Sequence, residues 1–147
     1  MEREGMNAVT FETDAFRLGL STKIMGHLLV LVYRTNLEIL PHLSLPSIYQ
    51  SGVVYREEPM GIERWKDAMR VLHDGYGDCE DLACWRAAEL TLSGIRAVPV
   101  FKSRMIAGNI RLYHILVKRA DGIIEDPSYV LGMRPGFNAS SPASWRE

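Results

Sequence analysis

The stretch that decides the fold is residues 77–94, which read GDCEDLACWRAAELTLSG within a chain of 147 residues. Asp78 suits an N-cap, and Asp81, three residues later, completes a capping box of the kind that starts a helix at Cys79 or the next residue. Gly94 is a natural stop for that helix. We therefore expect Cys79 at the positive end of a helix dipole, which favours the thiolate, the nucleophilic form of cysteine.

The acidic side chains around Cys79 oppose this ionisation. Asp78, Glu80 and Asp81 place three carboxylates next to a thiol that must lose its proton. A cationic neighbour has to offset them, and His114 supplies an imidazole later in the chain.

Three later segments have the apolar and β-branched composition of strands, namely 95–101, 112–118 and 123–126. His114 lies on the second and Asp126 on the third, so the loop between them decides whether they meet, because side chains alternate faces along a strand. A two-residue turn at Asp121 and Gly122 would put them on opposite faces. A three-residue loop ending in a left-handed Gly122 would set Leu116 opposite Asp126 and make the two residues diagonal neighbours.

The rest of the chain predicts two further helices joined by a loop. Residues 22–39 read as a broadly apolar, buried helix, and residues 61–73 carry apolar side chains at helical spacing. Between them, residues 43–58 hold proline and glycine, and we expect irregular structure that lines a cleft. We expect one domain with loosely ordered ends at 1–15 and 134–147.

Composition disfavours several classes of partner. Lys and Arg number 17 against 18 Asp and Glu, so the chain lacks the basic excess that nucleic-acid binding requires. The longest apolar run, 28–33, is far shorter than the roughly 20 residues of a membrane span, and the first residues lack a signal-peptide pattern. Cys79 and Cys84 would point apart on one helix, so we expect reduced thiols in the cytoplasm, with Cys84 in the core.

In their order, these segments resemble the transglutaminase-like superfamily of papain-related thiol enzymes. The matching pieces are Gly77-Asp78-Cys79 with Ala83, Gly94-Ile95-Arg96-Ala97-Val98, Tyr113-His114 and Asp126-Pro127-Ser128, within residues 60–130. Segments 49–55, 77–81 and 125–128 are also similar to small members from bacteriophages and prophages. The resemblance implies an α+β, papain-like fold in which N-terminal helices pack on a small antiparallel sheet of three or four strands.

The same resemblance implies a catalytic triad. Cys79 attacks an amide or ester carbonyl, His114 relays the proton and Asp126 orients the imidazole, and the chemistry independently asks for these roles. The oxyanion needs two donors, one of which is expected to be the backbone N–H of Cys79. The candidates for the other donor, with the first preferred, are Gln50, Tyr49, Tyr55 and Trp65.

Two departures from the family bear on the substrate groove. Glu80 stands where an aromatic residue often follows the nucleophile, and no tryptophan follows His114. We expect cysteine-dependent acyl transfer on amide bonds of a peptide or protein, by a peptidase or amidase before a transglutaminase. No cofactor or metal is required for this chemistry.

Two other classes stay open. The first is a structural or assembly component that keeps the fold with or without a working triad, is incorporated in a phage virion and contacts other phage structural proteins. The second is a zinc site on Cys79, His114 and Asp126, which ranks last because it offers only three ligands.

Overall fold

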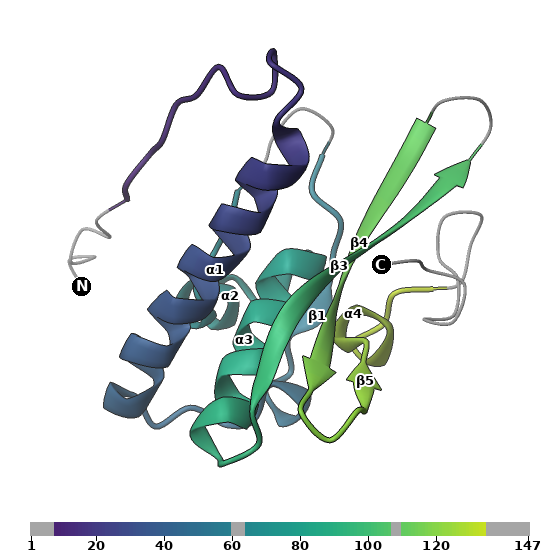
Figure 1. Cartoon of the computed structure of the whole chain (residues 1–147). Coiled ribbons are helices and arrows are strands. Elements are labelled where there is room, and N and C mark those ends of the chain that lie inside the picture. Colours follow the sequence, from purple (N-terminus) through teal and green to yellow (C-terminus); the bar gives the residue numbers. More distant parts are fainter. Residues whose placement is uncertain (1–7, 60–63, 107–109, 135–147) are drawn as a thin grey trace.

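The computed structural model of the protein describes residues 8–59, 64–106 and 110–134, with the backbone alone at 104–106 and 110–112. Its elements are α1 (Ser21–Ile39), the 3₁₀ helices η1 (Leu40–His42) and η2 (Ile48–Gln50), β1 (Val54–Tyr55), α2 (Ala68–Asp74), β2 (Tyr76–Gly77), α3 (Cys79–Leu92), β3 (Ala97–Ile106), β4 (Ile110–Arg119), β5 (Ile124–Glu125) and α4 (Pro127–Val130) (Figure 1). The chain is α+β, as predicted.

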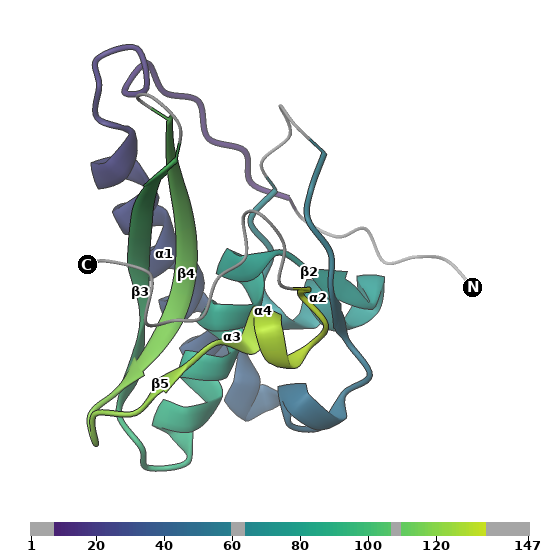
Figure 2. The ribbon, with the colours of Figure 1, turned by 90° about the vertical axis from the view of Figure 1, so that its right-hand side faces the viewer.

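An antiparallel sheet in the order β3-β4-β5 forms one layer of the fold. β3 and β4 pair along their whole length, from Ala97 opposite Arg119 to Ile106 opposite Ile110. α3 packs against both strands, and α1 packs against α3 and β3 (Figures 1 and 2). β1 and β2 form a separate, short parallel pair beside the start of α3.

The centre of the fold is α3, whose small and apolar residues serve two hydrophobic clusters. The first cluster consists of Leu29, Val32, Ala83, Cys84, Ala87, Leu90, Ala97, Ile115 and Val117. The second consists of Ile48, Val53, Ala68, Val71, Leu82 and Trp85. Alanines and a cysteine on α3 let α1 and the sheet approach closely, and the buried position of Cys84 agrees with its predicted core role. Burial on nearly all sides fixes the helix whose first residue is Cys79.

The helix predicted over residues 61–73 begins later than expected, at Ala68. Asp67 accepts a hydrogen bond from the Arg70 N–H at 2.9 Å and is the N-cap, while the backbone N–H of Lys66 donates to Asp81 at 2.8 Å. Residues 64–67 are therefore not helical, and residues 60–63 lie outside the described chain. The Lys66–Asp81 hydrogen bond and the Asp67 cap therefore set the start of α2, which the helical spacing alone did not predict.

Three other predictions, on the strands, the loop and the chain ends, compare with the structure as follows. β3 and β4 are ten residues each and so run longer than predicted, because polar residues such as Lys102 and Ser103 interrupt the apolar pattern that marked the strands. The loop expected over 43–58 contains η2 and β1. Most of the loosely ordered ends, 1–7 and 135–147, falls outside the described residues.

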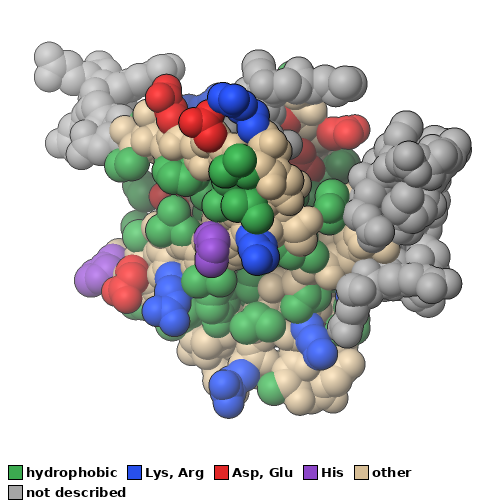
Figure 3. Space-filling model, turned by 45° about the horizontal axis from the view of Figure 1, so that its top comes forward, with side chains coloured by type: hydrophobic (Ala, Val, Ile, Leu, Met, Phe, Trp, Pro, Cys, Tyr) green, Lys and Arg blue, Asp and Glu red, His purple; other side chains and the backbone are tan. Residues whose placement is uncertain are grey.

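The surface carries mixed chemistry. In Figure 3, apolar side chains lie among acidic and basic ones on the face shown. The prediction that the helix over residues 22–39 is buried is wrong: α1 is amphipathic, with Leu29, Val32 and Asn36 buried along one side while His27 and Arg34 are exposed on the other. Within the described residues, no helix has the length and apolarity to cross a bilayer.

Candidate active site

The β4–β5 hairpin decides the relation of the predicted histidine and aspartate. Val117 lies opposite Glu125, and continuing this register places Leu116 opposite Asp126. The loop is the three residues 120–122, and its last residue is a glycine with φ of +89°, in the left-handed region. The three-residue alternative is therefore confirmed, and the two-residue turn is wrong.

His114 and Asp126 meet in a buried pair. Nε2 of His114 lies 2.9 Å from Oδ2 of Asp126, and the two residues are 3% and 8% exposed. The other carboxylate oxygen, Oδ1, accepts a hydrogen bond from the Tyr129 N–H at 3.2 Å as the N-cap of α4. With Asp126 ionised, Nε2 carries the proton and donates it, so proton exchange with a thiol would use Nδ1.

Cys79 starts α3 as predicted, with a complete capping box before it. The Asp78 carboxylate accepts from the Cys79 N–H at 2.7 Å, and the Asp81 carboxylate accepts from the Asp78 N–H at 3.1 Å. The thiol of Cys79 is half-buried, and the backbone N–H of Ile115 on β4 acts to lower the pKa of this thiol. Cys79 also packs against the first hydrophobic cluster, which α3 shares with the sheet.

Ile115 lies on β4, two residues before Val117, which pairs with β5. The Arg119 N–H donates to Ile123 across the hairpin at 2.9 Å, so the N–H groups of alternate residues, Ile115 among them, point to the same side. At the level of Ile115, β5 has already ended. His114 is the next residue along β4. The structure thus joins His114 to Asp126, the first residue after β5, and places the neighbouring Ile115 where its N–H acts on the Cys79 thiol.

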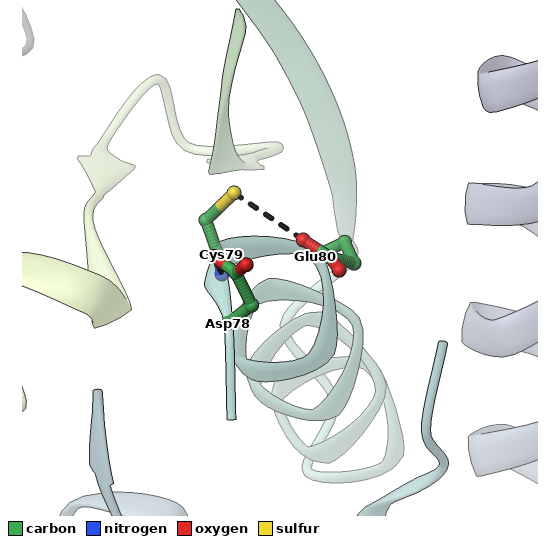
Figure 4. A group of neighbouring side chains, drawn as sticks. All are labelled: Asp78, Cys79 and Glu80. Carbon is green, nitrogen blue, oxygen red and sulfur yellow. Dashed lines mark hydrogen bonds between the residues drawn. The ribbon is translucent and has the colours of Figure 1, made fainter. Parts of the chain in front are cut away.

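The electrostatics of the thiol correct one expectation. The Cys79 thiol donates to Oε2 of Glu80 at 3.4 Å (Figure 4). Burial, followed by the charges of Glu80 and Asp78, raises the pKa of Cys79 well above its usual range, against a lowering by the Ile115 N–H. Burial and the two carboxylates together keep the resting thiol protonated at neutral pH, so it needs a base before it can attack.

The predicted oxyanion donors differ in their hydrogen-bond partners and their exposure. The Cys79 N–H is engaged by Asp78 in this conformation. Tyr49 donates its O–H to Glu125 at 2.7 Å, and Gln50, the preferred candidate, is exposed at the end of η2. Trp65 is half-buried and packs against the same hydrophobic cluster as Cys79.

Tyr55, another predicted donor, lies on β1 beside the strand that leads into α3. It pairs with Gly77, two residues before Cys79. Burial, then the charges of Asp78 and Cys79, raises the pKa of Tyr55 far above its usual value. The phenol consequently stays protonated and can donate at any physiological pH.

One group of metal-ligand atoms comes together in the described part of the chain. The carboxylates of Asp78 and Glu80 and the sulfur of Cys79 lie within 4.8 Å of one another. Asp78 caps α3 and Glu80 accepts from the thiol, so these atoms already serve the fold. The zinc set considered from the sequence, with His114 and Asp126, is not such a group among the described residues.

Sequence reasoning missed two residues of this region. Lys102 lies directly opposite His114 and is buried on the same face of the sheet. Its signal is a lysine inside an otherwise apolar strand pattern. Glu125 accepts bonds from Tyr49, Arg86 and Arg119, and its signal is only its position before Asp126.

Comparisons of the chain with protein-family models, with curated proteins and with solved structures find no match. The family suggested by the sequence is therefore still a prediction. The functional argument rests on the geometry where β5 ends.

Proposed function

We propose that this chain is a cysteine-dependent acyl-transfer enzyme of papain-like, transglutaminase-like type, with Cys79 as nucleophile, His114 as base and Asp126 as the group that orients the imidazole. The observation that carries the proposal is the buried His114–Asp126 bond of 2.9 Å on β4, beside Ile115, whose backbone N–H lowers the pKa of the Cys79 thiol at the start of α3. A buried hydrogen bond between two side chains contributes little net stability, so stability alone is a poor reason for this pair.

The resting protonation state sets the order of events. His114 takes the thiol proton through Nδ1 while the sulfur forms a bond to the substrate carbonyl carbon, and Asp126 stabilises the imidazolium that results. The imidazolium then protonates the leaving amine as the C–N bond breaks, leaving an acyl-thioester on Cys79. Tyr55 is our preferred side-chain donor to the oxyanion, because it pairs with Gly77, two residues before Cys79, and its phenol stays protonated.

The substrate is an amide bond of a peptide or protein. We propose water as the acyl acceptor before an amine, which makes the protein a peptidase or amidase before a transglutaminase. In either case attack on the thioester regenerates the thiol, and no cofactor enters the balance.

Acylation of the thiol tests the proposal. We would incubate the wild type and Cys79→Ser with p-nitrophenyl acetate, quench at short times and locate the acetyl group by peptide mass spectrometry. We expect acetyl on Cys79, and none at that position in the variant. A wild type that is acetylated no faster than Cys79→Ser would contradict the enzyme.

A second function is favoured by the raised pKa of Cys79, because a thiol that stays protonated is chemically quiet. The chain could then be a structural or assembly component, in a phage particle, that retains the fold. Two inert thiols in a folded wild-type protein would support this role over the enzyme.

A further inference from the structure

Glu125 lies on the two-residue strand β5, directly before Asp126, and its carboxylate accepts four hydrogen bonds. Oε1 accepts from the Tyr49 O–H at 2.7 Å and from Nε of Arg86 at 2.8 Å. Oε2 accepts from Nη2 of Arg86 at 3.3 Å and from Nη1 of Arg119 at 3.1 Å. These donors come from η2, α3 and β4, so one side chain joins β5 to three other elements.

The Glu125 network, defined as Tyr49, Arg86, Arg119 and Glu125, is largely shielded from water. The side chains of Arg86, Arg119 and Glu125 are 17%, 19% and 13% exposed. The guanidinium of Arg86 also stacks over the Tyr49 ring at 4.4 Å. Burial opposes ionisation of Glu125, but the hydrogen bonds from Arg86 and Tyr49 outweigh it and lower its pKa. The carboxylate is therefore charged and firmly held.

Arg86 extends the connection further. Its Nη1 donates to Glu89 at 2.7 Å, and Glu89 accepts from the backbone N–H of Ile48 at 2.9 Å. The Ile48–Glu89 bond therefore joins η2 to α3 independently of β5. Arg86 and η2, which supply donors to Glu125, are thus also held by Glu89.

Because side chains alternate along a strand, holding the Glu125 side chain in place also restrains the direction of Asp126. Successive side chains of a strand point to opposite faces, and Glu125 points to Arg86 of α3 while Asp126 bonds to His114. β5 has only two residue pairs with β4, which is a weak restraint on the residue that follows. Fixing the direction of Glu125 therefore fixes that of Asp126.

We propose that Glu125 is a positioning residue that, through Tyr49, Arg86 and Arg119, holds the Asp126 carboxylate against Nε2 of His114. The proposal rests on the proposed function for its purpose. Its physical content is the His114–Asp126 bond itself, which can be measured without any substrate.

The test is an NMR measurement of that bond. In protein labelled with ¹⁵N-histidine, the Nε2 proton of His114 is assigned by its loss in His114→Ala, and Asp126→Ala gives the spectrum of the broken pair. We expect Glu125→Gln to speed exchange of this proton with water by about tenfold or more, because the charge-assisted bonds that hold the strand are weakened. Tyr49→Phe removes one donor and should give a smaller change, about threefold, in the same direction.

The matched control is Asp74→Asn. Asp74 is a similarly shielded carboxylate, with Lys66, Arg70 and His73 as partners, but it lies on α2, away from β5. We expect it to lower the melting temperature and to leave His114 as in the wild type. Wild-type exchange in both Glu125→Gln and Tyr49→Phe would overturn the proposal, and if Glu125→Gln fails to fold, Tyr49→Phe decides.

Failure of this inference and failure of the proposed function are separable. An unchanged His114 proton with acetylated Cys79 rejects the positioning role alone. A perturbed His114 proton with an inert Cys79 keeps the positioning role and rejects the enzyme.

Discussion

Replacing Glu80 with glutamine should make Cys79 more reactive. Glu80 accepts a hydrogen bond from the thiol at 3.4 Å and its charge is the second largest cause, after burial, of the raised pKa of Cys79. Glutamine keeps the shape of the side chain and an acceptor oxygen but removes the charge that repels the thiolate. The sulfur should ionise more readily at neutral pH.

The distance sets the size of the effect. Two unit charges 3.4 Å apart repel by about 1.2 kcal/mol in bulk water and by about 5 kcal/mol at an effective dielectric constant of 20. The smaller figure alone raises the thiolate fraction about eightfold. A less basic thiolate is also a weaker nucleophile, with a Brønsted coefficient of about 0.4–0.5, so roughly half of the gain in log rate survives. We predict a rate at least about threefold higher.

The assay is the second-order rate of Cys79 with 4,4′-dithiodipyridine at pH 7, with Cys79→Ser as the blank. Glu38→Gln is the charge-matched control, because Glu38 is exposed on α1. It should leave the rate unchanged. Equal rates in Glu80→Gln and the wild type, with the melting temperature preserved, would refute the electrostatic reasoning.

Three further predictions concern the fold and the site. Gly122→Ala should lower the free energy of unfolding in urea by roughly 1 kcal/mol, because φ is +89° there. The control Gly26→Ala in α1, where a Cβ would approach nothing closer than 3.7 Å, should stabilise the protein. A stabilising Gly122→Ala would contradict the left-handed conformation of this loop residue. Burial raises the pKa of Asp81 to about 7, so native Asp81 keeps a proton that the unfolded chain releases, and its contribution to stability falls as pH rises from about 4 to 7. Urea unfolding should therefore show that the stability of the wild type relative to Asp81→Asn is lower at pH 7.5 than at pH 4.5. An equal difference at the two pH values would count against the raised pKa of Asp81. Tyr55→Phe should slow acetylation of Cys79 by about 100-fold while the dithiodipyridine rate stays the same, and an unchanged acetylation rate would remove Tyr55 as oxyanion donor.

Local patterns in the sequence were sufficient for the parts of the site that local chemistry determines. Asp78 and Asp81 predicted the capping box and the start of α3, because a cap depends on residues within one turn. The hairpin loop left two registers open, and the left-handed glycine after Ala120 and Asp121 selected the one that joins His114 to Asp126.

The missed features depend on contacts between distant segments. The backbone of Lys66 donates to Asp81, fifteen residues later, and this bond moved the start of α2 in a way that helical spacing could not reveal. The pKa of Cys79 is the net result of burial, Glu80, Asp78 and a backbone N–H of β4, and only the packed structure supplies the first of these. The Glu125 network likewise draws on residues 49, 86 and 119.

The most direct test of the central claim is whether His114 serves Cys79 as a base. We would measure the rate of iodoacetamide alkylation of Cys79 from pH 6 to 9 in the wild type, His114→Ala and His73→Ala, with the label located by mass spectrometry. His73 is the matched control, because it is exposed and bonded to Asp74. The account predicts that His114→Ala lowers the rate at pH 7 by about 100-fold and that His73→Ala leaves it unchanged. Equal rates in all three proteins would contradict it.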